Sequence, residues 1–421
     1  MFNPVITSRT NKTDFIKNIR NVRVVLIYFL AFIVGHSVMA QQVVHIADGL
    51  EKIGFENIRT LKFSNEYYIA LENTVFRWEP AAIVAALDYI TEVVGENAEI
   101  NLVFTENGIP QKVVSINSDS WGDLLKNPGS KNTNDWLVVT GNTGEAWTRL
   151  KNQAVTNPSF TKVDFVIFPQ FAYENTRLAK LYEFQFNAAP TMNFSLWKGN
   201  KFTGQVIFPL HNELGYEGNF IRPGYITVSQ DFRPFEKWWG TLALGNFSSN
   251  RYGIDLTFKH LFKNENWLLE LNAGCTGTSH FYDNKWLHGP LNTITGLAAI
   301  SWYNEKFDMV FRGGILQYIY KDKGLMASVT RYFGEVAVGF YAQVNEHNYN
   351  AGVNMTIPLP VRKRKSRNQF NVTIPEHLEF SYNAGTELFY GQYFRSNPMI
   401  NQIKNIKFTL LTKKNVLNLI K

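Results

Sequence analysis

The sequence of 421 residues is poor in cysteine, in charge and in long hydrophobic runs. Its single cysteine, Cys275, cannot form an internal disulfide, which excludes a disulfide-stabilised scaffold. The surrounding residues predict a strand, in which Cys275 would be a small apolar filler. After residue 42 no apolar run approaches the ~18 residues that indicate a membrane-spanning helix. If the mature chain crosses a membrane, it must do so with strands.

Charged residues make up only 18% of the chain, and the formal net charge is +7. Residues 1–40 contribute five basic residues and one acidic residue, or +4, so the remainder carries 7 − 4 = +3. An excess this small does not indicate a nucleic-acid-binding surface. We therefore expect no nucleic-acid partner.

Residues 1–40 have the organisation of a secretory signal peptide. A basic segment precedes the apolar stretch Val24–Val34, and Val38-Met39-Ala40 supplies a small-residue cleavage site. The alternative is a retained membrane anchor. The apolar stretch is about half the ~20 residues that a spanning helix needs, so cleavage is favoured and the mature protein is exported.

Residues 41–120 predict a small α+β domain. The expected elements are a helix at 44–53, a strand at 66–72, a helix at 80–94 closed by Gly95, and a hairpin around Asn107-Gly108. This region has no nucleophile–base pair, no paired metal ligands and no glycine-rich phosphate loop. We interpret it as a docking domain, followed by a linker with short elements at 121–160.

Residues 161–383 repeat the two-residue period of β-strands. In the segment Gly253–Phe262 apolar residues alternate with polar ones, and turn signals separate many such segments. Segments of ~10 residues have the length of a tilted strand that crosses a bilayer. We therefore predict a mainly β protein, in which a transmembrane antiparallel β-barrel of about 12 strands occupies residues 161–383. Residues 384–421 are expected to be a tail that packs beneath it.

The orientation of the apolar faces decides between two architectures. In a soluble sandwich the apolar set points inward, whereas in a membrane barrel it meets lipid and the polar set lines the lumen. Aromatic residues cluster at the predicted strand ends, as in interfacial girdles. The examples are Tyr173, Trp197, Trp238-Trp239, Trp267, Trp286, Trp302-Tyr303 and Tyr332-Phe333. Together with the export signal, they favour the barrel.

Charged residues within the strands are expected to line the lumen, because charge that faces lipid is costly. These candidates are Asp231, Arg233, Asp255, Lys259, Glu270, Arg312 and Arg331. Two interpretations are open: ion pairs that fill a closed interior, or a polar conduit. The first is favoured, since a barrel of ~12 strands has little open lumen once side chains fill it.

A strongly basic turn follows the last long strand. It contains Arg362, Lys363, Arg364, Lys365 and Arg367. Such a turn can contact anionic lipid head groups or an acidic polymer, and it can equally be a solvated loop.

A family resemblance adds to this interpretation. Gly54-Phe55-Glu56-Asn57-Ile58, the segment Tyr68–Asn73 and the Pro80–Val94 helix resemble the periplasmic domain of YjbH-like proteins. The segments Gly324–Phe333, Val338–Tyr341 and Gly352–Leu359 are similar to late barrel strands of that family. These are outer-membrane barrel proteins associated with exopolysaccharide production, and the resemblance spans roughly residues 45–380. It implies no catalytic residues.

The leading hypothesis is a non-enzymatic outer-membrane protein that assists exopolysaccharide secretion or surface assembly. Its N-terminal domain would lie in the periplasm, and its partners would be outer-membrane lipid, polysaccharide and export proteins. The alternative is a general porin or small-solute channel. A lipid-modifying hydrolase is disfavoured, because the histidines are scattered and no Gly-x-Ser-x-Gly elbow is present. No cofactor is expected.

Overall fold

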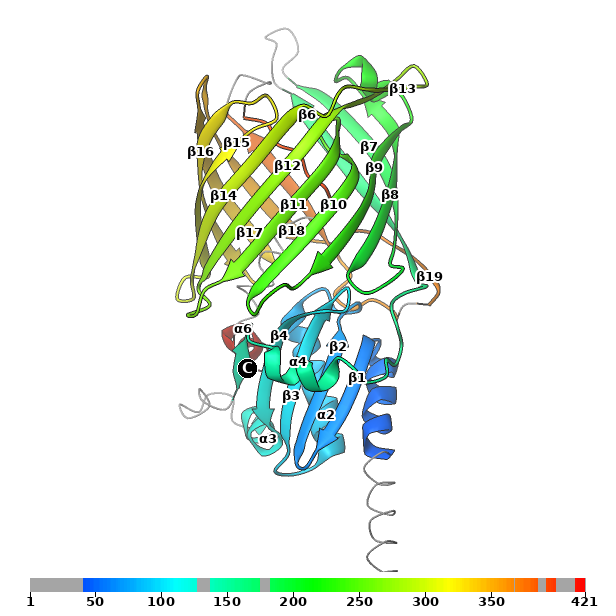
Figure 1. The fold of residues 1–421 in the computed structure, drawn as a ribbon, viewed down its shortest axis with the longest axis vertical. Coiled ribbons are helices and arrows are strands. Elements are labelled where there is room, and N and C mark those ends of the chain that lie inside the picture. The colour runs from blue at the N-terminus through cyan, green and yellow to red at the C-terminus, as the bar shows by residue number, and fades with distance from the viewer. Residues whose placement is uncertain are drawn as a thin grey trace, which may run out of the picture.

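The computed structural model describes residues 41–126, 137–174, 182–366, 368–384, 391–398 and 413–420. The predicted signal peptide and Arg367 lie outside these ranges. The described residues form one sheet of five strands and one of fifteen. Figure 1 shows the small sheet and its helices beneath one end of the large sheet, which curls round into a cylinder.

The N-terminal domain begins with a helix at residues 41–53. Its named elements are β1 (Glu56–Phe63), β2 (Glu66–Glu72), α2 (Glu79–Val94), β3 (Glu99–Glu106), β4 (Ile109–Asn117), α3 (Ser118–Lys126), β5 (Val138–Thr140) and α4 (Gly144–Leu150). The strands lie in sequence order, and β2 and β3 are parallel because α2 crosses between them. The structure thus contains an α+β domain at its N-terminal end.

The local signals in this domain produced the expected elements. Helix α2 has Pro80 in its first turn, buries Ile83 and Leu87, and is closed by Gly95 at a φ of 79°. The β3–β4 hairpin turns at Asn107 and Gly108, whose φ values of 51° and 73° are those a type I′ turn requires.

The domain extends further along the chain than the sequence indicated. The prediction ended it at residue 120 and assigned 121–160 to a linker. In the structure Trp121 and Leu124 of α3 join the main core, and Leu150 of α4 joins a second core on the other side of the sheet. All three side chains are fully buried, so this segment is part of the folded unit. Strand β1, which the sequence did not predict, forms one edge of the sheet.

The large sheet is antiparallel along most of its length. Its strands are β6 (Val163–Glu174), β7 (Glu183–Phe194), β8 (Asn200–Asn212), β9 (Arg222–Phe232), β10 (Trp238–Phe247), β11 (Arg251–Leu261), β12 (Trp267–Tyr282), β13 (Lys285–His288), β14 (Thr293–Asn304), β15 (Met309–Gln317), β16 (Lys323–Phe333), β17 (Val336–Asn345), β18 (Tyr349–Pro358), β19 (Phe370–Thr373) and β20 (His377–Asn383). Twelve have nine or more residues, whereas β13, β19 and β20 have 4, 4 and 7. The prediction of about 12 strands corresponds to the long ones.

The two ends of the large sheet meet without a continuous ladder. Strand β19 pairs in parallel with the first residues of β6, and β20 pairs with β18. Among the described residues no ladder joins β6 to β20. Instead, the ring of Tyr173 on β6 stacks on Phe380 of β20, with centroids 5.9 Å apart and planes 4° from parallel. At this point the two ends of the sheet are in aromatic contact and are not joined by a hydrogen-bonded ladder.

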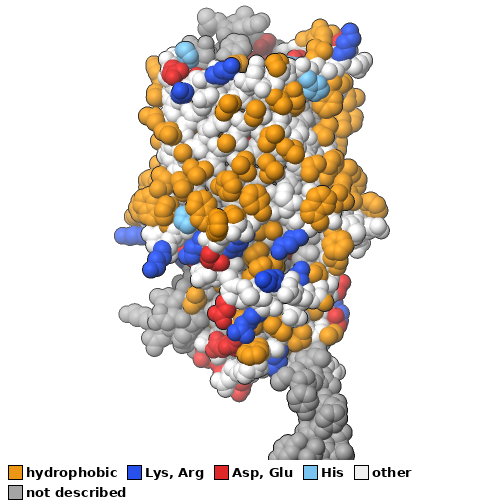
Figure 2. Space-filling view, in the orientation of Figure 1, with side chains coloured by type: hydrophobic (Ala, Val, Ile, Leu, Met, Phe, Trp, Pro, Cys, Tyr) orange, Lys and Arg blue, Asp and Glu red, His pale blue; other side chains and the backbone are white. Residues whose placement is uncertain are grey.

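The two faces of the large sheet differ in polarity. Large apolar side chains face outward, including Leu244, Ile254 and Phe340, which are 45%, 44% and 64% exposed. Polar side chains such as Thr227 and Thr276 face inward and are buried. Figure 2 shows hydrophobic side chains spread over the face of the cylinder that it draws. A two-layer sandwich would bury this set, so the sandwich alternative is wrong for this sheet.

The aromatic residues at the strand ends divide between the two faces. Trp197, Trp267, Trp302 and Phe333 are exposed on the outside, as expected for girdles, whereas Trp286 is exposed but lines a cavity at the end of the cylinder away from the N-terminal domain. For three others the girdle prediction is wrong, because Trp239, Tyr303 and Tyr332 face inward and are at most 8% exposed. The reason is the strand period: each directly adjoins a residue of the outward set and so points the opposite way.

The C-terminal segment returns through the cylinder. Residues 391–398 contact inward-facing side chains on distant strands: Ser396 bonds Asp255 of β11, and Arg395 bonds Glu379 of β20. Helix α6 (Lys413–Ile420) packs against α2, with Val416 buried in the main core of the N-terminal domain. The two parts of the tail thus lie inside the cylinder and beneath it. No helix among the described residues is long and apolar enough to cross a membrane.

Candidate functional site: the filled interior and its junction with the N-terminal domain

The inward-facing charges of the large sheet are paired with one another or with polar side chains. Arg312 donates to Glu270 at 3.1 Å, and Lys259 lies directly opposite Glu270 on the neighbouring strand. Asp255 accepts hydrogen bonds from Asn272 at 2.6 Å and from Ser396 at 2.7 Å. Four of the predicted lumen residues therefore lie inside. Removing a charge from water costs free energy. The partners of these residues offset that cost, which an unpaired charge would bear in full.

Residues 391–398 occupy part of this interior. The ring of Phe394 stacks on Phe247 with centroids 5.2 Å apart, and the guanidinium of Arg395 donates to Glu379 at 2.9 Å. The backbone of Arg395 also exchanges hydrogen bonds with Ser248. These contacts attach the segment to β10, β11 and β20, so it is a fixed part of the interior.

At the other end of the cylinder, the tip of the β3–β4 hairpin enters the mouth. Ile109 forms a buried cluster with Trp239, Leu261 and Leu268, which face inward from β10, β11 and β12. The side chain of Asn107 donates to Asp231 at 2.7 Å. The tip therefore contacts the wall with both apolar and polar groups. Asp231, a predicted lumen residue, faces inward as expected, and its carboxylate accepts from both Asn107 of the N-terminal domain and Thr241 of β10.

The shape of the hairpin tip depends on Glu72, a buried residue at the end of β2. Its carboxylate accepts the backbone N–H groups of Asn107 at 3.0 Å and Gly108 at 2.9 Å. It also accepts the side-chain amide of Asn57 at 2.8 Å. Burial raises the pKa of Glu72, and the hydrogen bonds from Gly108, Asn57 and Asn107 oppose that shift. Glu72 thus holds the turn in the conformation that reaches the wall.

Arg233 connects the strand wall to the N-terminal domain. Its guanidinium donates to the carbonyl of Pro110 at 2.9 Å, to that of Gly141 at 2.7 Å and to the hydroxyl of Thr143 at 2.7 Å. It also lies 4.7 Å above the ring of Trp239. The prediction that Arg233 lines a lumen is wrong. It lies one residue beyond the end of β9, where the neighbouring surface is the docked domain.

A charged cluster lies beside this contact. Glu265, in the turn between β11 and β12, accepts hydrogen bonds from Lys237 at 2.8 Å and from the backbone N–H of Gly141 at 3.0 Å. Burial alone would raise the pKa of Glu265, but the bonds from Lys237 and Thr140 and the charge of Lys112 lower it. Lys112 of β4 is buried, and this burial lowers its pKa to about 8.

The basic turn also contacts the N-terminal domain. The backbone N–H of Arg77 donates to the carbonyl of Arg362, and that of Arg364 donates to the carbonyl of Val75. The ammonium group of Lys363 lies 5.0 Å above the ring of Phe76. Arg77 itself makes a two-pronged ion pair with Glu335, with N–O distances of 2.5 and 2.7 Å. Arg362, Lys363 and Lys365 expose much of their surface, so the backbone of the turn docks while these cations face solvent.

For Arg331 the lumen prediction is wrong. Residues of β16 alternate, and Arg331 shares the outward face with Leu325 and Phe333. Its guanidinium lies 4.9 Å from the ring of Phe333. At the end of a strand a long cationic side chain can lay its stem along apolar surface and place its charge beyond it. That is why a charge is compatible with the outer face at this position.

The interacting residues of the junction came mostly from outside the predicted set. Glu72, Arg77 and Lys112 carried no signal of their role, since each is an ordinary charged residue in its local sequence. Asn107-Gly108 was recognised as a turn, but nothing in the sequence indicated where that turn would dock. No group of three or more His, Cys, Asp or Glu side chains that could hold a metal occurs within the described ranges.

Comparisons with known proteins give little further information. No protein-family model matches the chain, and no curated protein sequence matches it. Two solved structures of OmpT (in-vitro folded), an outer membrane protein of Vibrio cholerae, align at 9% identity over 46% of this chain. One is the trimer form; the TM-scores are 0.24 and 0.23, over 82% and 80% of those chains. A likeness this weak bears on neither the fold nor the function of this chain.

Proposed function

We propose that the chain is a β-barrel protein of the bacterial outer membrane, with its N-terminal domain in the periplasm. The observation that carries this proposal is the polarity of the large sheet. Apolar side chains cover its outside, as a bilayer requires, and polar side chains are packed within. In water such a surface would be an exposed apolar patch far larger than soluble monomers carry.

The termini and turns fit the same orientation. All of the contacts with the N-terminal domain come from one end of the cylinder, which would be the periplasmic end (Figure 1). The basic turn then lies on the periplasmic side, next to the membrane surface. Outer-membrane fractionation followed by gel migration with and without heating tests this proposal. We expect a heat-modifiable band in the outer-membrane fraction, and a water-soluble protein would refute it.

We further propose that the interior is closed, which disfavours the porin alternative. Paired charges fill the middle, residues 391–398 occupy part of the space, and the β3–β4 hairpin tip covers the periplasmic mouth. The purified protein in planar bilayers should therefore give no stable open channel. Steady ion conductance from the wild-type protein would support the porin and refute the closed interior.

On the resemblance to YjbH-like proteins, we propose that this closed barrel assists exopolysaccharide secretion or surface assembly without being an enzyme. The N-terminal domain is fixed rigidly to the barrel by the junction, so it can present a periplasmic docking surface to export proteins. Deleting the gene and measuring secreted and surface polymer tests this role. We expect polymer to fall, and unchanged polymer under producing conditions would contradict it.

A further inference from the structure

A cavity lies at the end of the cylinder away from the N-terminal domain. Its volume is about 240 Å³, and residues of β6, β8, β9, β10, β12 and β13 line it. Drug-sized ligands occupy pockets of about 300–1,000 Å³, so this one suits a smaller unit. In the proposed orientation it opens toward the cell exterior. We call it the distal cavity.

One side chain in the distal cavity has a polar atom without a partner. Gln205 is 2% exposed, and its Oε1 has no hydrogen-bond partner among the described residues. Its Nε2 donates to the hydroxyl of Thr191 at 2.8 Å, and that hydroxyl donates onward to the carbonyl of Ala189. The hydroxyl therefore accepts from Gln205, which leaves Oε1 as an acceptor without a partner, buried beside Gly224 in the wall of the cavity. A buried acceptor without a partner is costly, and a ligand hydroxyl would relieve that cost.

Arg222 supplies donors to the same space. Its guanidinium donates to the carbonyls of Gly218 and Phe220 at 3.5 and 3.4 Å, which are long, weak hydrogen bonds. The planar guanidinium therefore keeps donor capacity for a ligand oxygen. Glu217, the carboxylate at this site, is already bound by His280 at 3.0 Å and Asn250 at 3.2 Å.

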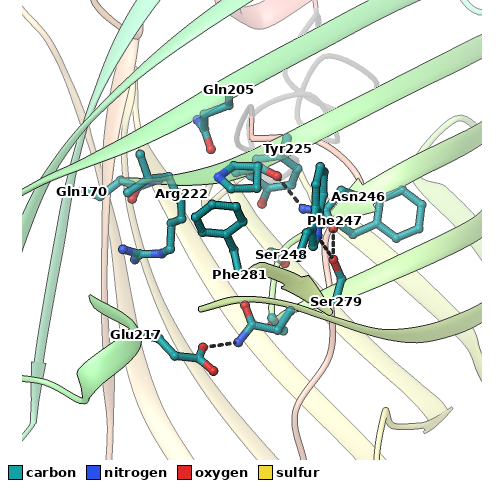
Figure 3. Close-up of a pocket in the computed structure, with 16 residues that line it drawn as sticks. Gln170, Gln205, Glu217, Arg222, Tyr225, Asn246, Phe247, Ser248, Ser279 and Phe281 are labelled. Carbon is teal, nitrogen blue, oxygen red and sulfur yellow. Dashed lines mark hydrogen bonds between the residues drawn. The ribbon is translucent and has the colours of Figure 1, made fainter. Parts of the chain in front are cut away.

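Aromatic side chains complete the lining. Figure 3 shows Tyr225 and Phe281 beside Gln205 and Arg222, and Trp286 of β13 belongs to the same lining. The indole N–H of Trp286 donates to Ser279 at 2.8 Å, and Ser279 donates to Asn246 at 2.6 Å, so the ring is held in place. Fixed rings offer apolar faces, while the amide and guanidinium offer directed polar contacts.

From this combination we infer that the distal cavity binds one pyranose unit of a glycan. A pyranose ring has C–H faces that pack on aromatic rings and hydroxyls that both donate and accept. One hydroxyl can accept from Arg222, and another can donate to Gln205 Oε1 once the amide turns from Gly224 toward the cavity. The inference rests on the proposed polysaccharide role and extends it: the exterior end of the barrel recognises the polymer, or a sugar of the cell surface, by a terminal unit.

Binding is tested with the full-length protein in detergent micelles, using galactose, N-acetylglucosamine and glucuronate as probes. Ligand-observed NMR measures the dissociation constant. We expect millimolar binding of at least one probe, weakened about tenfold in Gln205→Leu and in Trp286→Ala, since the first removes a polar group and the second an aromatic face of the cavity lining. Preference for glucuronate would mark an acidic polymer paired with Arg222, and preference for the others a neutral one.

Trp197→Ala is the matched control. Trp197 is also an exposed indole whose N–H bonds a side chain, Gln230 at 2.8 Å, but it lies at the opposite end of the cylinder. This variant should bind like the wild type. No binding by the wild-type protein up to tens of millimolar, or equal loss in all three variants, overturns the inference. If gene deletion lowers polymer but the purified protein binds no sugar, the sugar site alone is refuted. Binding without a polymer phenotype refutes the polysaccharide role alone.

Discussion

Replacing Arg233 by alanine should loosen the N-terminal domain from the mouth of the cylinder. The guanidinium is 8% exposed and bridges the strand wall to Pro110, Gly141 and Thr143. Its removal leaves the carbonyl of Gly141 without this donor. Pro110 keeps the bond from the indole of Trp239 at 3.1 Å, so the loss is partial.

The magnitude follows from the number of bonds that have no substitute. Hydrogen bonds to a charged group contribute roughly 1.5–3 kcal/mol each, and such contributions are not additive. Truncating one member of a buried charged contact costs about 2–5 kcal/mol. We therefore expect about 3 kcal/mol, which corresponds to a junction that opens about 100-fold more often.

Hydrogen exchange measures this opening directly, because several backbone amides are bonded across the junction. The N–H groups of Gly141 and Thr143 donate to Glu265 and Glu236 of the strand wall, and that of Gly199 donates to Asn107. Peptides that contain these amides should exchange about 100-fold faster in Arg233→Ala. Peptides from the centre of β10 should be unchanged.

Arg149→Ala is the control for this experiment. Arg149 forms an ion pair within the N-terminal domain, with Glu145 at 3.3 Å, and Glu145 is 79% exposed. Exposed pairs of this kind contribute about 0–1 kcal/mol, so exchange at the junction should stay near the wild-type rate. Unaltered exchange of Gly141, Thr143 and Gly199 in a folded Arg233→Ala protein would refute the account of the junction.

Three further changes test other parts of the account. Phe340→Arg places a cation on the outer wall and should reduce the unfolding free energy in lipid by about 2–4 kcal/mol, whereas Tyr349→Arg at a strand end should reduce it by at most about 1 kcal/mol. Folding titrations in liposomes measure both changes. Equal reductions in the two variants would contradict the membrane belt. Arg77→Glu should expose the basic turn to protease, and adding Glu335→Arg should restore protection; no rescue would show that the ion pair does not hold the turn. Lys112 has a pKa of about 8 in the folded protein and its ordinary pKa of 10.5 in the unfolded chain, so between these pH values the unfolded chain binds more protons. The unfolding free energy should therefore rise with pH in this range. Lys112→Met should abolish this rise in denaturant titrations, and an identical rise in the variant would refute the assignment.

The alternation of residues was enough to predict the strands and their faces. Ile226 and Val228 point outward while Thr227 and Ser229 point inward, because a strand has a period of two whatever surrounds it. Which side would be apolar was a physical inference from export and aromatic content. The structure agrees with that inference.

The same alternation could have corrected one of the two charge predictions that failed. Arg331 is in register with Leu325 and Phe333, so the two-residue period places it on the outer face. The prediction placed it inside because charge in lipid is costly, but that cost is small at the end of a strand, where Arg331 lies. Arg233 is in the inward register, but the last inward position of a strand contacts the domain that covers the mouth of the cylinder. The alternation within a strand contains no information about which domain docks there.

Long-range partners were not predictable from local sequence. Ser396 and Asp255 are 141 positions apart, and Asn107 and Asp231 are 124 apart. Each pair forms only because the sheet curls and the hairpin docks. Gln205 illustrates the same limit, since an inward glutamine on a strand looks ordinary until its bonds are traced and one acceptor is left over.

The native cysteine offers the most direct test of the outward apolar belt. Cys275 lies near the middle of β12, between Ile254 and Ile294 of the neighbouring strands, on the outer wall. A fluorophore attached to Cys275 in the unfolded protein, which is then refolded into liposomes, should be quenched by lipids brominated along their acyl chains and little affected by iodide in the buffer. Quenching by iodide with no response to the brominated lipids would place this wall in water and contradict the account.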